Sequence, residues 1–102
     1  MTYQLVIQLP CISLKDYDAL IDLEEILLER LSDPNEVDGH DSGAGEMNIF
    51  IRTNDPESLF KEIEEILREG VFWPHIRVAY RDTLKNDFVI KWPKELASFK
   101  IA

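Results

Sequence analysis

Apolar residues along this chain alternate in some segments and recur at helical spacing in others. In residues 3–9 every second side chain is large and apolar, which predicts a β-strand that Pro10 ends. Residues 46–52 are rich in β-branched and aromatic side chains and predict a second strand. The same criteria predict two further strands, at roughly 76–81 and 87–92. The chain is therefore expected to form a sheet of at least four strands.

Two segments between these strands have the spacing of amphipathic helices. The first helix can be capped by Ser13 and must end before Pro34, because proline cannot continue a helix. The second is expected to begin with Asp55 as its N-cap and Pro56 at the first helical position, with Gly70 just past its end. The buried stripe of the first helix is expected to contain Tyr17, Leu20, Ile21, Leu23, Ile26, Leu27, Leu28 and Leu31, and that of the second Leu59, Phe60, Ile63, Ile66 and Leu67.

The segment between the first helix and the strand at 46–52 decides the strand count. It holds three of the four glycines and almost no large apolar side chains. If Glu36–His40 is a short strand, the glycine-rich stretch is a hairpin turn and the order becomes β-α-β-β-α-β plus one extra strand. This order predicts an α+β fold, a two-layer ferredoxin-like sandwich with both helices on one face of an antiparallel sheet. If the segment is a loop, four strands keep the same layers. Either way, residues 1–102 are expected to be a single domain.

Such a sheet has one face under the helices and one open face. Alternation gives the covered face Leu5, Ile7, Leu9, Ile49, Ile51, Ile76, Val78 and Tyr80, and the open face Gln4, Val6, Gln8, Asn48, Phe50, Arg52, Arg77 and Ala79. Phe50 and Val6 lie near the centre of the open face, where a large exposed apolar patch usually has a partner. A second subunit, forming a homodimer through the open sheet face, or the tail 94–102 would cover it.

The net charge restricts the partners that the chain can bind. It has 20 Asp and Glu against 11 Lys and Arg, a net charge of −9. An acidic chain repels nucleic-acid phosphates and anionic lipid, so we expect neither nucleic acid nor membrane as a partner. The charge is also uneven, −12 over residues 1–70 and +3 over 71–102. This asymmetry is either the solvated face of two helices or an acidic surface for a basic protein partner.

The cellular setting follows from what the sequence lacks. No apolar run approaches the roughly 18 residues of a membrane span, and the N-terminus has neither the basic nor the apolar part of a signal peptide. The single cysteine, Cys11, cannot form an internal disulfide, which suits a reducing compartment. We therefore expect a cytoplasmic location.

The segment 38–46 carries the side chains that could support chemistry. A phosphate site is not expected, because residues 31–51 contain no lysine or arginine. The side chains that could ligate a metal are Asp38, His40, Asp41 and Glu46. An EF-hand that starts at Asp38 would have Ile49 where it requires glutamate, and the chain has no zinc-type spacing. We therefore predict no metal and no cofactor.

Catalysis by this segment would require its side chains to converge. His40 could act with Asp41 or Asp38, and Ser42 could serve as a nucleophile, but neighbouring residues of a strand point apart. The other interpretation is a turn that glycine permits and in which Asp and Ser bind backbone amides.

The run Val37–Ile51 and the Thr53-Asn54-Asp55-Pro56 that follows resemble a family of small, uncharacterised bacterial proteins of about this length. The distinctive part is Gly-x-Gly-Glu-Met-Asn-Ile-Phe-Ile. Some members carry an automatic "ABC transporter" label, which fails here because the sequence has no P-loop and no membrane segment. The resemblance implies a bacterial, cytoplasmic protein and names no catalytic residue.

Two functional hypotheses result from the sequence. The first is a non-enzymatic acidic binding module that engages a protein partner, or itself, through the 38–46 turn and the open sheet face; toxin-neutralising immunity proteins are one class with this profile. The alternative is a small enzyme or ligand-binding domain that uses His40 and Asp41 near the strand 46–52. The candidate ligand- or partner-binding residues are Asp38, His40, Asp41, Asn48, Phe50 and Arg52.

Overall fold

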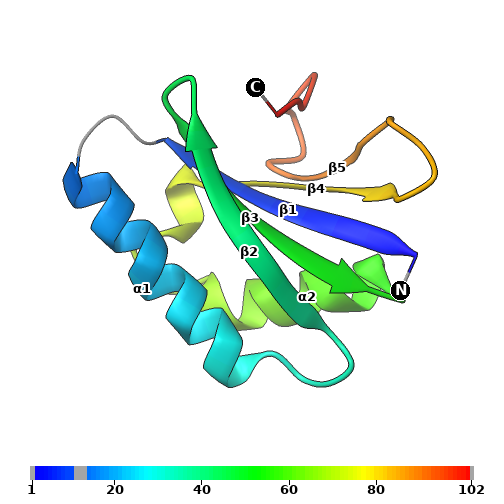
Figure 1. Cartoon of the computed structure of the whole chain (residues 1–102), viewed down its shortest axis with the longest axis horizontal. Helices are drawn as coiled ribbons and strands as arrows, with labels where there is room; N and C mark the ends of the chain where they lie inside the picture. The colour runs from blue at the N-terminus through cyan, green and yellow to red at the C-terminus, as the bar shows by residue number, and fades with distance from the viewer. Residues whose placement is uncertain (1, 11–13, 102) are drawn as a thin grey trace.

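The computed structural model describes residues 2–10 and 14–101, which form an α+β fold of one sheet and two helices (Figure 1). The elements are β1 (Tyr3–Pro10), α1 (Leu14–Arg30), β2 (Glu36–Gly43), β3 (Glu46–Thr53), α2 (Pro56–Leu67), a short 3-10 helix (Trp73–His75), β4 (Arg77–Asp82) and β5 (Val89–Trp92). The expectations for Cys11 and Ser13 lie outside the described residues. No helix in the part of the chain that the structure describes is both long enough and apolar enough to cross a membrane.

The sheet has five antiparallel strands in the order β2-β3-β1-β4-β5. The first four strands and the two helices follow the predicted β-α-β-β-α-β order, and both helices lie on one face (Figure 1). The ferredoxin-like α+β sandwich is thus confirmed, and β5 extends it beyond four strands at the edge beside β4. The segment after α1 is a strand, and it is longer than expected because β2 pairs with β3 as far as Gly43.

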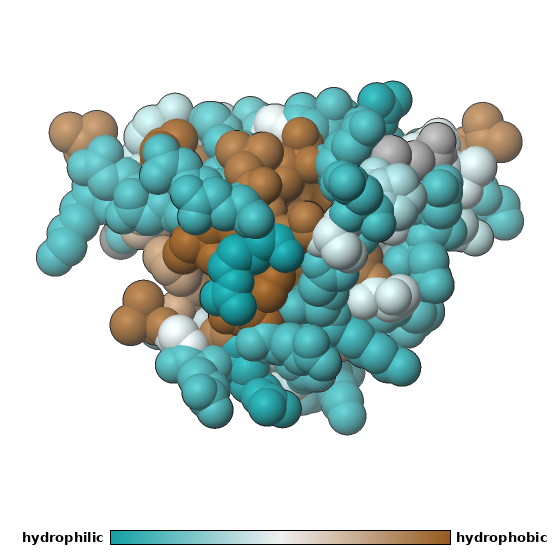
Figure 2. Space-filling model, turned by 90° about the horizontal axis from the view of Figure 1, so that it is seen from below, coloured by the Kyte–Doolittle hydropathy of each residue, from teal (hydrophilic) through white to brown (hydrophobic). Residues whose placement is uncertain are grey.

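The main core lies between the sheet and the helices. The strand residues assigned to the covered face are buried there, apart from the partly buried Tyr80, and they pack with Leu20, Leu23, Leu27, Leu59, Ile63 and Leu67 of the helices. Partly buried apolar residues of both helices flank this core, and Figure 2, seen from the helix side, shows a hydrophobic area among hydrophilic residues.

One residue of the predicted stripe on α1 is exposed rather than buried or half-buried. The side chain of Leu28 is 60% exposed, although the spacing of apolar residues placed it with Leu27. The physical reason is helix geometry. Successive residues are about 100° apart around the axis, and the buried line through Leu20, Leu23 and Leu27 leaves Leu28 at the side of the helix.

The start of α2 follows the prediction, whereas its end does not. The carboxylate of Asp55 accepts a hydrogen bond from the Ser58 N–H at 3.1 Å, and Pro56 is the first helical residue. The helix ends at Leu67, earlier than expected, so Gly70 is not the residue just past its end. The Gly70 N–H donates instead to the Leu67 carbonyl at 2.9 Å, which satisfies an oxygen at the helix terminus.

The sheet face opposite the helices is covered at its centre. Val6 and Ala79 have no solvent exposure, yet neither belongs to the core under the helices. The segment after β5 lies on this side (Figure 1), and the Gln8 Nε2 donates to the Lys100 carbonyl at 3.1 Å. The ring of Phe99 lies 4.9 Å, between centroids, from that of Phe88. The C-terminal segment therefore covers part of the face that alternation leaves open.

Candidate functional site

The β2–β3 hairpin carries all six candidate residues, but it divides them between two faces. His40 pairs with Ile49, whose side chain is buried under the helices, and Asp41 pairs with Asn48 on the opposite face. His40 and Asp41 therefore point apart, as adjacent residues of a strand must. The two side chains do not form one reaction centre.

His40 links β2 to helix α1. Its Nδ1 lies 2.9 Å from a carboxylate oxygen of Glu24, and its Nε2 lies 3.3 Å from the Tyr17 hydroxyl. With its proton on Nδ1, the imidazole donates to Glu24 and accepts from Tyr17, so all three groups are satisfied. The side chains of His40 and Glu24 are only 26% and 15% exposed. This arrangement of carboxylate, imidazole and phenol packs α1 against β2 and also places an acid–base pair at the surface.

A row of hydrogen bonds crosses four strands on the opposite face. The Asn48 Nδ2 donates to Asp41 at 2.9 Å, the Gln8 Nε2 donates to the Asn48 Oδ1 at 3.1 Å, and the Arg77 Nη1 donates to the Gln8 Oε1 at 3.3 Å. The two amide side chains are almost fully buried. Alternation placed Gln8, Asn48 and Arg77 on this face, but the continuous row depends on the strand register, which alternation leaves undetermined.

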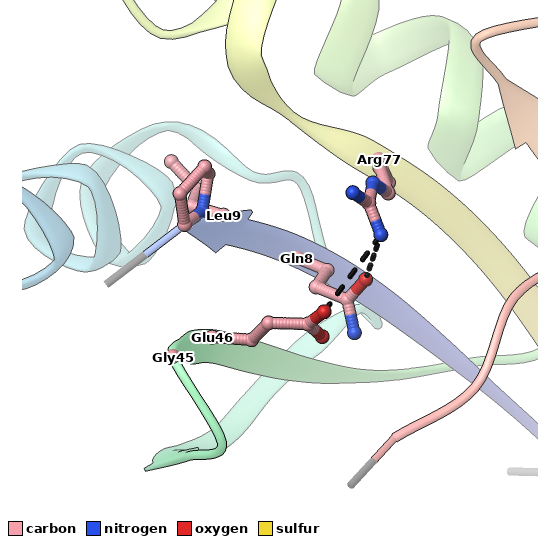
Figure 3. A pocket seen from close by; sticks show the side chains of 6 residues that line it. Gln8, Leu9, Gly45, Glu46 and Arg77 are labelled. Atoms are coloured by element: carbon pink, nitrogen blue, oxygen red, sulfur yellow. Dashed lines mark hydrogen bonds and ion pairs between the residues drawn. The ribbon is translucent and has the colours of Figure 1, made fainter. Parts of the chain in front are cut away.

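A small cavity opens at one end of this row (Figure 3). Its volume is about 130 Å³, room for a few water molecules, and the end of β1 and the start of β3 form its walls. Arg77 and Glu46 face each other across it, with the Arg77 Nη1 3.8 Å from a Glu46 carboxylate oxygen. Because the two charges offset each other, the cavity is not a strong site for either an anion or a cation.

Of the remaining three candidates, Phe50 and Arg52 lie further along β3 and Asp38 lies on β2. Phe50 is half-buried beside Val6 in the row that the C-terminal segment covers. Arg52 is exposed, and its Nε lies 3.9 Å from the carboxylate of Asp38 at the β-bulge of β2. An exposed ion pair of this kind contributes little to stability. Asp38 and Arg52 are thus accessible for contacts with another molecule.

Exposed acidic residues gather on α1 and β2, which lie side by side (Figure 1). The sequence shows the excess of acidic residues but does not show that those of α1 and β2 lie on neighbouring elements. We call the exposed carboxylates of this region the acidic surface; they belong to Asp18, Asp22, Glu25, Glu29, Asp33, Glu36 and Asp38, whereas Asp41 faces away from α1. Within residues 14–43 only Lys15 and Arg30 are basic.

A separate cluster links α2 to β4 and β5. The Lys91 Nζ donates to one oxygen of Glu57 at 2.6 Å, and the Tyr80 hydroxyl donates to the other at 2.8 Å. The hydrogen bond from Lys91, followed by that from Tyr80, lowers the pKa of Glu57. Burial, followed by the hydrogen bond to Glu57, raises the pKa of Tyr80 to about 12. Sequence reasoning missed this cluster because its members are far apart in the chain.

The described residues do not form a metal centre. Among residues 2–10 and 14–101, no three His, Cys, Asp or Glu side chains come together as a metal ion requires. Comparison with protein-family models, curated proteins and solved structures finds no match to this chain. A functional proposal must therefore rest on the geometry and charge described above.

Proposed function

We propose that this protein is a non-enzymatic interaction module that binds a basic protein partner through the acidic surface and the β2–β3 hairpin. The observation that carries this proposal is the acidic surface itself, in which exposed carboxylates of α1 and β2 lie on neighbouring elements. Such a surface attracts a positively charged partner over a distance and accelerates its association.

The hairpin adds groups suited to specific contact. Asp38 and Asp41 are exposed on an edge strand, and Arg52 stands beside Asp38. An edge strand presents unpaired backbone N–H and C=O groups that another chain can bind. The centre of the open sheet face contributes less, because Val6 and Ala79 there have no solvent exposure and the C-terminal segment lies on this face. Self-association through that face stays an alternative that requires this segment to move.

The setting that we propose is the bacterial cytoplasm, as the resemblance of residues 37–51 to small bacterial proteins implies. The net charge of −9 and the single cysteine are consistent with a binding protein that stays soluble in a reducing compartment.

Affinity capture with charge-neutral variants tests the proposal. Glu29→Gln with Glu36→Gln removes two charges from the acidic surface, and Glu65→Gln with Glu69→Gln removes the same number from exposed positions in the last part of α2 and just after it. We expect the first variant to capture less of the partner that the unmodified chain retains, and the control variant to retain it fully. Equal capture by both double variants would contradict a role for the acidic surface.

A second candidate function is acid–base catalysis at the surface. It is suggested by a chain of hydrogen bonds that runs from the Glu24 carboxylate through the His40 imidazole to the Tyr17 phenol. A small activated ester such as p-nitrophenyl acetate is a suitable probe. This candidate predicts that His40→Gln slows hydrolysis, whereas His75→Gln, which removes an exposed imidazole, has a much smaller effect. If the two variants lost the same amount of hydrolytic activity, His40 would have only a structural role.

A further inference from the structure

A groove opens where α1 ends and β2 begins. Its volume is about 320 Å³. The apolar residues Leu27, Leu28, Leu31 and Val37 line one part of it, and the polar residues Asp33, Asn35 and Glu36 line the rest. None of the seven residues that line it is basic.

The apolar residues of this groove are partly accessible. Leu28 is 60% exposed, Leu31 and Val37 are half-buried, and Leu27 at the base is fully buried in the core. An isolated exposed leucine would need no explanation. Here the exposed leucine lines a hollow of mixed polar and apolar character beside the buried Leu27, so an apolar side chain that inserts next to Leu28 would be shielded from water together with part of Leu28.

The charges around the groove determine what can enter it. Glu25 lies one helical turn before Leu28 and Glu29 lies next to it, and both are exposed. Arg30 is about 200° around the helix from Leu28, so it points away from the groove. The leucines of the groove therefore lie among exposed carboxylates of α1 and of residues 33–36, and Arg52, the register partner of Glu36 on β3, is the basic residue beside them on the sheet.

We propose that this groove docks a segment of a protein partner that inserts a leucine-sized apolar side chain and carries lysine or arginine within a few residues on either side. This inference rests on the proposed function and specifies the partner's chemistry. The apolar side chain would contact Leu28, Leu31 and Val37, and the flanking cations would face Asp33, Glu36, Glu25 and Glu29. A second copy of this chain is a poorer occupant, because two chains of net charge −9 repel each other.

The test uses the full chain, labelled with ¹⁵N, and three synthetic peptides of equal length. The first has leucines at helical spacing among lysines, the second replaces each leucine by serine, and the third replaces each lysine by glutamate. We expect the leucine–lysine peptide to bind at least about tenfold more tightly than either of the others. The largest amide shift changes should occur at Leu28, Leu31 and Val37.

Matched variants locate the contact. Leu28→Ser should weaken binding of the leucine–lysine peptide by about tenfold or more. Leu84→Ser removes a leucine that is 92% exposed in another part of the molecule and should leave this affinity unchanged. Because Leu28 is itself exposed, its replacement should not unfold the chain, and circular dichroism verifies that.

Each failure has a distinct meaning. If the leucine–lysine and serine–lysine peptides bind equally and Leu28→Ser has no effect, the groove is refuted as a docking site while charge-driven binding, and with it the proposed function, stands. If no lysine peptide binds, both fail. If the glutamate peptide binds as well as the lysine peptide, the partner's basic character is wrong. If the chain self-associates and Leu28→Ser abolishes this, the occupant is a second copy and the proposal of a basic partner is overturned.

Discussion

Buried polar side chains in this protein are held by specific partners. Among the described residues, Gln8, Asn48 and Thr53 are polar and almost fully buried, and each has a hydrogen-bond partner within the chain. Leaving such a group without a partner costs more than the bond itself contributes, because water no longer solvates it. These side chains therefore fix the positions of the segments that they connect.

Replacing Thr53 by Val should destabilise the protein. The Thr53 hydroxyl donates to the Asn35 Oδ1 at 2.7 Å and accepts from the Asp55 N–H at 3.0 Å, so it connects the segment before β2 with the start of α2. We expect a loss of about 1–2 kcal/mol in the free energy of unfolding, measured by urea denaturation. Thr83→Val, at an exposed hydroxyl, is the control and should change the free energy much less. If both substitutions lowered the free energy of unfolding equally, burial of the Thr53 hydroxyl would not be the reason for its contribution to stability.

The pKa of Tyr80 makes stability depend on pH in the alkaline range. Its phenol loses its proton at about 12 in the folded protein, against 10.0 as the ordinary value, so the folded state holds the proton more tightly. The resulting stabilisation is fully present below pH 10 and is lost as the pH rises from about 10 to about 12. Denaturation of the wild type should show this decline, and Tyr80→Phe should show a smaller one. Identical pH profiles for the two proteins would disprove the linkage.

The lowered pKa of Glu57 makes stability depend on pH in the acidic range, with the opposite sign to that of Tyr80. Lys91, and secondarily Tyr80, lower this pKa below its ordinary value of 4.5, so the stabilisation is present above that pH and is lost as the pH falls below it. Lys91→Met removes the largest cause, and we expect the pKa of Glu57, followed by ¹³C NMR of its carboxyl group, to rise. Lys85→Met, at an exposed lysine outside this cluster, is the control and should leave the pKa of Glu57 unchanged.

The β2–β3 hairpin shows how an element is fixed by its turn. Gly43 pairs with Glu46, which leaves Ala44 and Gly45 as the two-residue turn, both with positive φ, 52° and 78°. Two positive φ values are typical of the type I′ turn, whose twist matches that of antiparallel strands. Asparagine tolerates this conformation at the first position better than alanine.

Ala44→Asn should therefore stabilise the protein, by a few tenths of a kcal/mol up to about 1 kcal/mol. Gly45→Ala should destabilise it by about 1 kcal/mol, because a Cβ is unfavourable at φ 78° even though no atom lies within 4 Å of its position. Thermal denaturation measures both changes. A stabilising Gly45→Ala would show that the backbone of this turn differs from the one described.

Most elements could be predicted because their signals are local. The strand at 46–52 and the helix start at Asp55-Pro56 depend on residue types and caps within a few positions. At Glu36–His40 the sequence does not distinguish a strand from a loop, since its polar residues do not alternate with apolar ones. The exposure of Leu28 and the His40 contacts with Glu24 and Tyr17 could not be predicted, because they depend on how α1 is rotated and placed against β2.

The two faces of the sheet are covered by different parts of the chain. The helices bury one face, while the other is covered at its centre by the segment that follows β5 (Figure 1). Alternation identified Val6, Phe50 and Ala79 as neighbours on this face, and the strand register agrees. It left a second subunit and the C-terminal tail as alternatives, and the Gln8 contact with Lys100 identifies the tail as a cover within one chain.

Loosening this tail should convert the covered face into a surface for self-association. Phe99 packs on Phe88, so Phe99→Ser removes an anchor of the segment and should expose the apolar row beneath it. We expect the wild type to be a monomer in size-exclusion chromatography with light scattering, and the variant to bind more of a hydrophobic dye and to form dimers as concentration rises. Val71→Ser, at a side chain that is 78% exposed elsewhere, is the control and should behave as the wild type. The opposite result would be a wild type that dimerises and a Phe99→Ser variant that is monomeric. It would mean that the C-terminal segment forms part of a dimer interface, so that a partner subunit also covers the second face of the sheet.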